Sequence, residues 1–466
     1  MTRGGIRPDR AMETPPLTRQ LAGFIERTQW KDIPQAVRYE AKRALVNYFA
    51  VCLAGSSDPD VAKAISLFER FSSGQQARLI GREERTDMLN AASLNAMSAN
   101  VYDFDDTHIP TIIHPTAPVA AALFALAETS RFSGEQLLLA FVLGVEVECR
   151  LGMAVFPDHY QRGWHITSTC GVFGAAAGSA KLLGLDAQQH RWALGNASAQ
   201  SSGLVETLGS ASKSIGVGNA ARNGLLSALL AQEGFAGPEQ PIEGERGFLR
   251  VMGEHPDFLQ ISEGLGERWA LLANTYKPYP CGVVLNPVIE ACQGLYQDRE
   301  WSMDEVVRVE LTGHPLLRER TDRPDIRSGR ESQVSAQHAV AVVLSTGEAS
   351  LAQFSDEAVA DPELRALYPK LVFIDDTAYG VDAAQVGIFL QSGQTLSRKV
   401  AVSRGSLAAP LSDLDLERKL RELAEYGRSG CAAQPLIDAL WSLDQASDAS
   451  AVMQLAAGRS LSIFRS

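Results

Sequence analysis

The sequence lacks the features that mark several large classes of protein. Its six cysteines are scattered without a C-x-x-C pair, so neither a zinc knuckle nor a disulfide framework is indicated. Basic residues are fewer than acidic ones, and the net charge of -12 argues against nucleic acid or an anionic membrane as a partner. No apolar run reaches the roughly 20 residues that a membrane-spanning helix needs. We therefore expect a globular protein of a reducing cytoplasm, with no membrane partner.

Signals for targeting and for nucleotide binding are also missing. The segment from Met1 to Pro16 mixes arginines with acidic residues and has no apolar core of a secretory signal, so we interpret it as a mobile tail or a remnant of expression. Gly216-Val217-Gly218 resembles part of a nucleotide-binding fingerprint, but no predicted strand precedes it. The sequence thus gives no indication of a nucleotide cofactor.

What the chain does contain is a long helical period. Segments 17–28 and 34–55 place apolar residues three and four apart, which predicts two amphipathic helices. Ser133 and Gln136 predict a capping box ahead of a helix that is apolar nearly all round. Glycines spaced along segment 171–178 predict close helix packing, because glycine is costly inside a helix unless two backbones approach there.

The pattern changes after about residue 273. Segment 305–313 alternates apolar and polar residues, which predicts a half-buried strand, and segment 384–403 predicts a β-hairpin turning at Ser392-Gly393. The helical period returns after Pro410. The sequence thus predicts a mainly α fold: a large helical domain built from residues 17–272 and 409–466, and a smaller α+β lid domain inserted at 273–408.

One stretch, VYDFDDTHIPTIIHPTAPVAAALFALAE (residues 101–128), sets carboxylates and histidines against a long apolar run. Asp103, Asp105, Asp106 and Thr107 are residue types that cap helices, and a helix is predicted to begin near Pro115. Capping does not require three carboxylates together with His114, so we favour a functional site. A second functional interpretation is an iron or manganese centre that uses these carboxylates with His108 or His114.

Further stretches carry residues suited to chemistry. His165, in GWHITSTCG, is either a satisfied core residue or a neighbour of a helix N-terminus that binds a carboxylate. Lys213 lies among small residues in GSASKSIGVG, and Lys277 lies between two prolines in NTYKPYPCG at the predicted domain junction. Clefts between domains are common ligand sites, although the prolines alone are also explained by a stiff hinge.

Taken in order, DFDDTH, HP, GWHITSTCGVFGAAAGSAKLLGLD, SKSIGVGNAARNG and KPYPCG resemble the MmgE/PrpD family from about Leu17 to the C-terminal helices. The family includes 2-methylcitrate dehydratases, cis-aconitate decarboxylases and iminodisuccinate epimerases, and the resemblance implies a helical domain with a lid, usually as a homodimer. It also implies candidate catalytic and substrate-binding residues. The candidate catalytic residues are Asp103, His165, Lys213 and Lys277, and the candidate substrate-binding residues are Thr107, His114, Tyr279 and Arg330.

The sequence departs from the family pattern at positions that bear on the reaction. Gly216 and Asn286 stand where many members have histidine, and no tyrosine lies just before Arg323-Pro324. All three family activities develop negative charge on a carbon next to a carboxylate. An epimerase needs only a base on one face and an acid on the other, so the loss of histidines harms it least.

We therefore predict an epimerase of a small amino- or imino-dicarboxylate, similar to iminodisuccinate epimerase. The alternative is a lyase of the same family, either a dehydratase or a decarboxylase of a citrate-like acid. An inactive binding or scaffold protein is a third hypothesis, against which the retained histidines and lysines speak. We predict that activity requires no metal, flavin, nicotinamide or pyridoxal phosphate, and that the partners are a small di- or tricarboxylate and a second copy of the chain.

Overall fold

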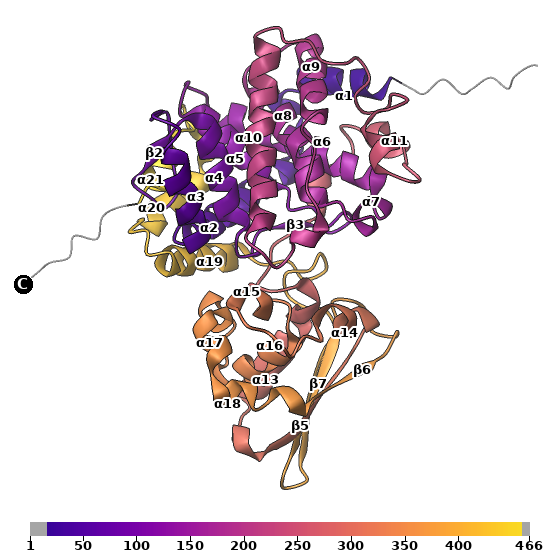
Figure 1. Ribbon diagram of the computed structural model, residues 1–466, viewed down its shortest axis with the longest axis vertical. Coiled ribbons are helices and arrows are strands. Elements are labelled where there is room, and N and C mark those ends of the chain that lie inside the picture. The colour runs from indigo at the N-terminus through magenta and orange to yellow at the C-terminus, as the bar shows by residue number, and fades with distance from the viewer. Residues whose placement is uncertain (1–15, 459–466) are drawn as a thin grey trace, which may run out of the picture.

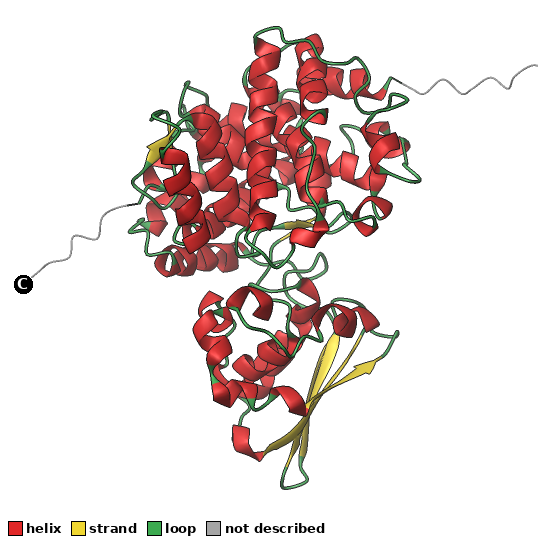
Figure 2. Cartoon of the chain, viewed as in Figure 1, coloured by secondary structure: helices red, strands yellow, loops and turns green. Residues whose placement is uncertain are grey.

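A computed structural model describes residues 16–458 of the chain. Figure 1 shows a larger helical body above and a smaller body below it, and Figure 2 shows that most of the strand structure belongs to the smaller body. The interpretation of Met1 to Pro16 as a tail falls, except for Pro16, outside the described residues. Within the described range no helix combines the length and the apolarity required to cross a bilayer.

The larger body is built from helices at both ends of the chain. Its helices are α1 (Leu17–Arg27), α2 (Gln35–Gly55), α3 (Pro59–Glu69), α4 (Met88–Asn100), α5 (Thr116–Ala127), α6 (Gly134–Val155), α7 (Asp158–Gln161), α8 (Ile166–Leu182), α9 (Ala187–Ser198), α10 (Ser212–Gln232), α11 (Phe248–Met252), α12 (Leu259–Ser262), α19 (Asp413–Tyr426), α20 (Ala433–Trp441) and α21 (Ala451–Leu455). Two short antiparallel pairs join β1 (Ala77–Arg78) to β2 (Arg85–Thr86) and β3 (Thr107–His108) to β4 (Asn274–Thr275).

One hydrophobic core unites these helices. It runs from Leu17 to Tyr276, includes Leu351 of the smaller body, and resumes from Leu411 to Ala456, so the C-terminal helices complete a core that the N-terminal half begins. Figure 1 shows α19 beneath α2, at the side of the helical body that faces the smaller body. The helices predicted at 17–28 and 34–55 are confirmed as α1 and α2.

Helices α6 and α8 pack closely because glycines face each other. A Cβ atom added at Gly174 would lie 2.7 Å from Glu148 Oε2 and 2.9 Å from the Gly144 carbonyl oxygen. Such separations leave no room for a side chain at position 174. The close packing predicted from the glycine spacing is therefore confirmed, as is the capping box of Ser133 and Gln136 at the start of α6.

The smaller body contains a four-stranded sheet and its own helices. In chain order these are α13 (Asn286–Gln297), β5 (Val306–Gly313), α14 (Pro315–Thr321), α15 (Gly329–Ser332), α16 (Ala336–Thr346), α17 (Asp356–Ala360), α18 (Pro362–Arg365), β6 (Leu371–Asp375), β7 (Ala384–Leu390) and β8 (Thr395–Val400). The strand order is β6-β5-β7-β8, with β5 and β6 parallel and the remaining neighbours antiparallel.

The strand and hairpin predicted from alternation are confirmed. Strand β5 occupies 306–313, and β7 pairs with β8 from Ala384 opposite Val400 to Phe389 opposite Thr395. Gly393 adopts a φ of 85° in the connecting turn, a conformation that favours glycine. A second hydrophobic core, formed by residues between Tyr279 and Leu390, lies in this body. The mainly α fold is thus observed, while the domain limits 272/273 and 408/409 and the role of the smaller body as a lid remain predictions.

Arg150 provides a test of what holds the larger body together. Its guanidinium is 2.6 Å from Glu146 Oε1, both side chains are 2% exposed, and it also donates to carbonyl oxygens of the loop at 260–268. Arg150→Met leaves a buried carboxylate without its cation, which typically costs about 3–5 kcal/mol. We expect a loss of this size in the free energy of urea unfolding.

The matched control is Arg398→Met, because Arg398 pairs with Asp298 where the two side chains are 54% and 75% exposed. An exposed pair contributes about 0–1 kcal/mol. Equal losses for the two variants would contradict the structural role that we assign to Arg150.

Candidate active site

A cavity of about 790 Å³ lies where the two bodies meet, and residues of both bodies line it. Seven of the eight candidate residues line it: Asp103, Thr107, His114, His165, Lys213, Lys277 and Arg330. They come from five separate stretches of the chain. The fold therefore brings together side chains that lie more than two hundred residues apart in sequence.

A short turn after α4 presents the first of these residues. Asp103 has a φ of 51°, in the left-handed region where aspartate and asparagine are tolerated better than most residues. Asn100 donates from Nδ2 to Asp105 Oδ2 at 2.7 Å and so ties the turn to the end of α4. Thr107 then pairs with Thr275 in the β3–β4 ladder, which brings the segment carrying Lys277 alongside.

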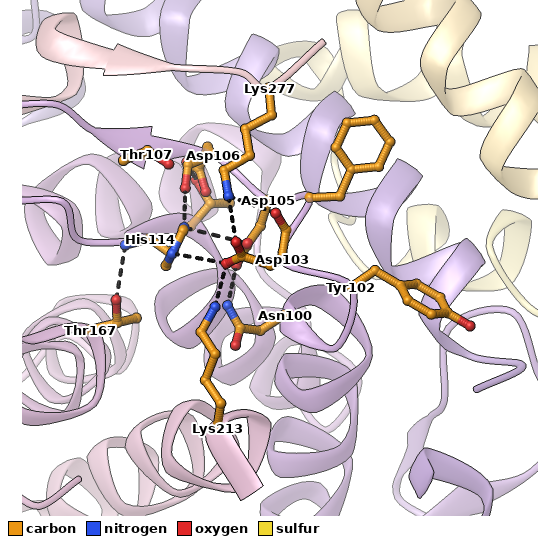
Figure 3. Close-up of polar contacts among 12 residues, drawn as sticks. Asn100, Tyr102, Asp103, Asp105, Asp106, Thr107, His114, Thr167, Lys213 and Lys277 are labelled. Atoms are coloured by element: carbon orange, nitrogen blue, oxygen red, sulfur yellow. Dashed lines mark hydrogen bonds and ion pairs between the residues drawn. The ribbon is translucent and has the colours of Figure 1, made fainter. Parts of the chain in front are cut away.

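Asp103 lies between two ammonium groups, as Figure 3 shows. Lys277 Nζ donates to Asp103 Oδ2 at 2.9 Å and to the Asp103 carbonyl oxygen at 2.6 Å, and Lys213 Nζ donates to Asp103 Oδ1. Burial raises the pKa of Asp103, but the charges of Lys213 and Lys277 outweigh it and hold that pKa well below its usual range. These three residues, the lysine–aspartate cluster, carry a net charge of +1 when both lysines are protonated.

The capping hypothesis holds for one aspartate at most. The residue that precedes α5 is Pro115, which has no side chain to cap the helix. Asp106 approaches this helix end, since its carboxylate accepts hydrogen bonds from the Thr116 hydroxyl and, at 2.6 Å, from Asn274 Nδ2. Burial raises the pKa of Asp106 to about 7. Capping is therefore the wrong explanation for Asp103, whose carboxylate binds lysines instead.

His114 faces the cluster with a defined tautomer. Its Nδ1 lies 2.7 Å from the Asp106 carbonyl oxygen, which only accepts, so Nδ1 carries the proton of the neutral ring. Nε2 then lies 3.5 Å from Asp103 Oδ1 with its lone pair available. Burial lowers the pKa of His114, so the ring is neutral near pH 7. Its backbone N–H donates to Thr167 Oγ1 at 3.1 Å and anchors it to α8.

His165 precedes α8 and presents a second imidazole. Its Nδ1 is 2.7 Å from Ser168 Oγ, which leaves Nε2 as the nitrogen for a ligand in the cavity. Burial, together with the charge of Lys213, lowers the pKa of His165 to about 3. A Cβ atom added at Gly216 would lie 2.5 Å from Ser168 Oγ. The glycine that departs from the family pattern therefore gives Ser168 the room to orient His165.

Thr107 offers a hydroxyl to the same space. Its side chain is 5% exposed and its Oγ1 has no hydrogen-bond partner among the described residues. The first residues of α8, Ile166 and Thr167, also line the cavity, and the free amides at the start of a helix favour anions. These groups are suited to carboxylate oxygens.

Two of the candidate substrate-binding residues differ from expectation. Tyr279 does not line this cavity: it is buried, and its hydroxyl donates to Gln293 Oε1 at 2.7 Å within the smaller body. Arg330 does line the cavity, but its guanidinium pairs with Asp58 at 3.0 Å and Asp60 at 3.1 Å. That charge is already matched, so Arg330 joins the smaller body to α3 rather than offering a free cation.

Sequence reasoning missed three other residues that line the cavity: Tyr160, Arg320 and Arg323. The guanidinium of Arg320, in α14, makes no hydrogen bond or ion pair with the described residues, whereas Arg323 Nε donates to the Arg320 carbonyl oxygen at 3.3 Å. Burial raises the pKa of Tyr160, and the charge of Arg320 opposes that rise. The arginine pair at 320 and 323 was the available signal, but only the fold turns it towards the cavity.

The metal hypothesis does not suit this set of charges. Ligand atoms of Asp103, Asp105 and His114 lie within 4.8 Å of one another. Lys213 and Lys277, however, already occupy the carboxylate of Asp103, and their ammonium groups would repel a divalent cation. The arrangement favours an anion.

Comparison with known proteins gives consistent matches along the chain. The MmgE/PrpD N-terminal domain matches residues 19–260, and the MmgE/PrpD C-terminal domain matches residues 279–445. A cis-aconitate decarboxylase-like protein of Aspergillus oryzae is 27% identical over 472 residues, covering 95% of this chain and 97% of the relative. A cis-aconitate decarboxylase of Aspergillus terreus is 27% identical with 94% and 95% covered, and that of Mus musculus is 26% identical with 96% and 94% covered.

The charge arrangement leads to a prediction about divalent metals. We expect the protein to bind no stoichiometric Mn²⁺ in a calorimetric or electron paramagnetic resonance titration, because the two ammonium groups oppose the ion. In the double variant Lys213→Met/Lys277→Met the carboxylates are released, and a gain in Mn²⁺ affinity should follow. Tight Mn²⁺ binding by the wild-type protein, lost in Asp103→Asn, would revive the metal hypothesis.

Proposed function

This chain belongs to the MmgE/PrpD family, and from that premise we propose that it is a lyase that decarboxylates a small unsaturated tricarboxylic acid of the cis-aconitate type. The observation that carries the proposal is full-length similarity to several cis-aconitate decarboxylases. These relatives favour the lyase alternative over the epimerase expected from the missing histidines. That expectation counted absent imidazoles, whereas His114 and His165 both line the cavity and are available for the proton-transfer role that we propose below.

The lysine–aspartate cluster is suited to hold the substrate. Its net positive charge attracts a carboxylate, and because both lysines are buried this attraction is stronger than in bulk solvent. The Thr107 hydroxyl and the amides at the start of α8 supply hydrogen bonds to carboxylate oxygens. Both lysine side chains are buried and fixed on Asp103, so little reorganisation is needed when charge develops.

In the proposed reaction the bond between carbon and the departing carboxylate breaks and carbon dioxide leaves. The electron pair stays on the substrate, is delocalised over the neighbouring double bond and carboxylate, and takes up one proton at carbon. The balance is one proton consumed and one carbon dioxide released, so no oxidant or reductant is required. Lys213 and Lys277 stabilise the charge that develops on the remaining carboxylate.

His114 and His165 are the proposed proton-transfer groups. Both are neutral in the ligand-free protein, because burial lowers the pKa of each. An anion bound beside them favours the imidazolium form, since an opposite charge nearby raises the pKa of a histidine. Binding of the substrate thus favours the uptake of one proton from solvent by one of these rings, and the resulting imidazolium is the acid that donates that proton to carbon. Their separate attachments, to Asp106 and Ser168, hold the two rings in fixed orientations.

Arg320 and Arg323 add positive charge from the smaller body. Both come from the smaller body and line the cavity. Since Arg320 has no hydrogen-bond or ion-pair partner among the described residues, its guanidinium is available to a carboxylate of the substrate. Positive groups from both bodies suit a substrate with more than one carboxylate.

The reaction class is decided by the products formed from cis-aconitate in D2O. We expect carbon dioxide and an unsaturated dicarboxylic acid in equal amounts, with one solvent deuterium on carbon per turnover, measured by NMR and a carbon dioxide assay. Exchange of an α-proton of an imino- or amino-dicarboxylate without carbon dioxide would restore the epimerase. Release of water from a 2-methylcitrate-type acid would establish the dehydratase.

The lysine–aspartate cluster should control the rate of this reaction. Lys277→Ala removes a group that stabilises developing charge, and such preorganised contacts are typically worth about 10²–10³-fold in kcat. Asp103→Asn should also reduce kcat/KM strongly while the protein still folds, because asparagine accepts the left-handed backbone of position 103. Steady-state kinetics with thermal unfolding as a check on folding measures both effects.

The control is Lys370→Ala. Lys370 Nζ donates to the Val306 carbonyl oxygen at 2.6 Å, and neither residue lines the cavity. We expect its rate to stay near that of the wild type. Normal turnover by both Asp103→Asn and Lys277→Ala would show that the cluster serves folding and not the reaction.

A further inference from the structure

Lys419 lies in α19, at the C-terminal end of the chain, and its side chain is buried at the junction of the two bodies. The residue is 6% exposed. Its ammonium donates to Asn47 Oδ1 at 2.8 Å and to the carbonyl oxygens of Phe104 and Lys277 at 2.9 Å each. It also lies 3.6 Å from the centre of the Phe104 ring, a cation–π contact. All three donor positions of the ammonium are therefore used.

The two carbonyl groups identify what this lysine holds together. One belongs to Phe104, the residue directly after Asp103, and the other belongs to Lys277 itself. Asp103 and Lys277 face each other on the cavity side through the contact between carboxylate and ammonium. Lys419, from a third and distant part of the chain, thus joins the backbone at Phe104 to the backbone at Lys277.

Stability alone is a poor explanation for a lysine at this position. Leu416, Leu420 and Leu423 of α19 are buried on the same face, and a hydrophobic side chain in place of a buried charge is often neutral or stabilising. Burial, reinforced by the charge of Lys277, lowers the pKa of Lys419 well below its usual range, so keeping this lysine charged costs free energy. The hydrogen bonds of Lys419 therefore need an explanation other than stability.

We propose that Lys419 is a positioning residue, which fixes the backbone at Phe104 and Lys277 so that Asp103 and the Lys277 ammonium meet in the orientation the reaction requires. The proposal rests on the decarboxylase function only for its kinetic consequence. The geometric part, that the contact between Asp103 and Lys277 depends on Lys419, stands independently of the reaction.

Lys181 supplies a matched control, because it also donates to three acceptors. Its ammonium contacts the carbonyl oxygens of Ile25 and Glu26 at 2.9 Å each and of Thr28 at 2.8 Å. These carbonyls end helix α1, and none of them lines the cavity. Lys181→Met therefore removes the same number of hydrogen bonds without touching the segments of Asp103 and Lys277.

The test compares Lys419→Met with Lys181→Met by kinetics, thermal unfolding and crystal structures. For Lys419→Met we expect kcat/KM to fall by about 10²-fold, the loss typical of a displacement of about 1 Å in a reacting constellation. We also expect the distance from Lys277 Nζ to Asp103 Oδ2 to exceed hydrogen-bonding range. Lys181→Met should lose stability while keeping both the rate and that distance.

The outcomes separate the positioning role from the proposed function. An unchanged Lys277–Asp103 contact together with unchanged kcat/KM in Lys419→Met would overturn the proposal. If Lys419→Met does not fold, Lys419→Leu, which removes all three donors and matches the neighbouring leucines of α19, is judged by the same two measurements. If the wild type turns over none of the candidate acids, the decarboxylase proposal fails, and the crystal structures alone decide whether Lys419 positions Lys277.

Discussion

The contact of one carboxylate with two ammonium groups is the constraint on which the cavity depends. Lys213 and Lys277 are both buried, and two like charges in such a place repel each other strongly. Asp103 lies between them and accepts from both. With one negative and two positive charges, the trio is stable enough to persist in the folded protein, yet it keeps a surplus positive charge for an anion.

The same balance extends to the neighbouring aspartates and explains why carboxylates precede a buried helix. Asp106 is held by the hydroxyl of Thr116 and the amide of Asn274, and Asp105 by the amide of Asn100. Behind them Lys419 supplies a third buried ammonium. Each carboxylate of the motif has its own partner, so the aspartates form one electrostatic unit ahead of the start of α5 and are not redundant helix caps.

Local pattern predicted most of the fold because local physics determines it. The capping box before α6, the glycines between α6 and α8, and the turn at Gly393 each depend on residues close in sequence or on one helix face. Local patterns could not predict which distant segments come together at the cavity. Thr107 lies opposite Thr275 only because β3 pairs with β4. The periodicity of the sequence does not predict a pairing between strands so far apart in the chain. Local sequence singled out Lys277, on the segment that this ladder positions, and Lys213, in α10, but their catalytic roles came only from the resemblance to a family.

Tyr279 and Lys419 show two limits of reasoning from the sequence. Tyr279 neighbours Lys277 in a motif, yet Pro278 separates them and the tyrosine turns into the core of the smaller body, because adjacency in sequence does not decide the direction of a side chain. Lys419 gave a signal that was present but unused: it occupies an apolar position of an amphipathic helix, between Leu416 and Leu423. A charged residue on an otherwise apolar face must find partners inside the protein, and here those partners are the backbone segments that carry the lysine–aspartate cluster.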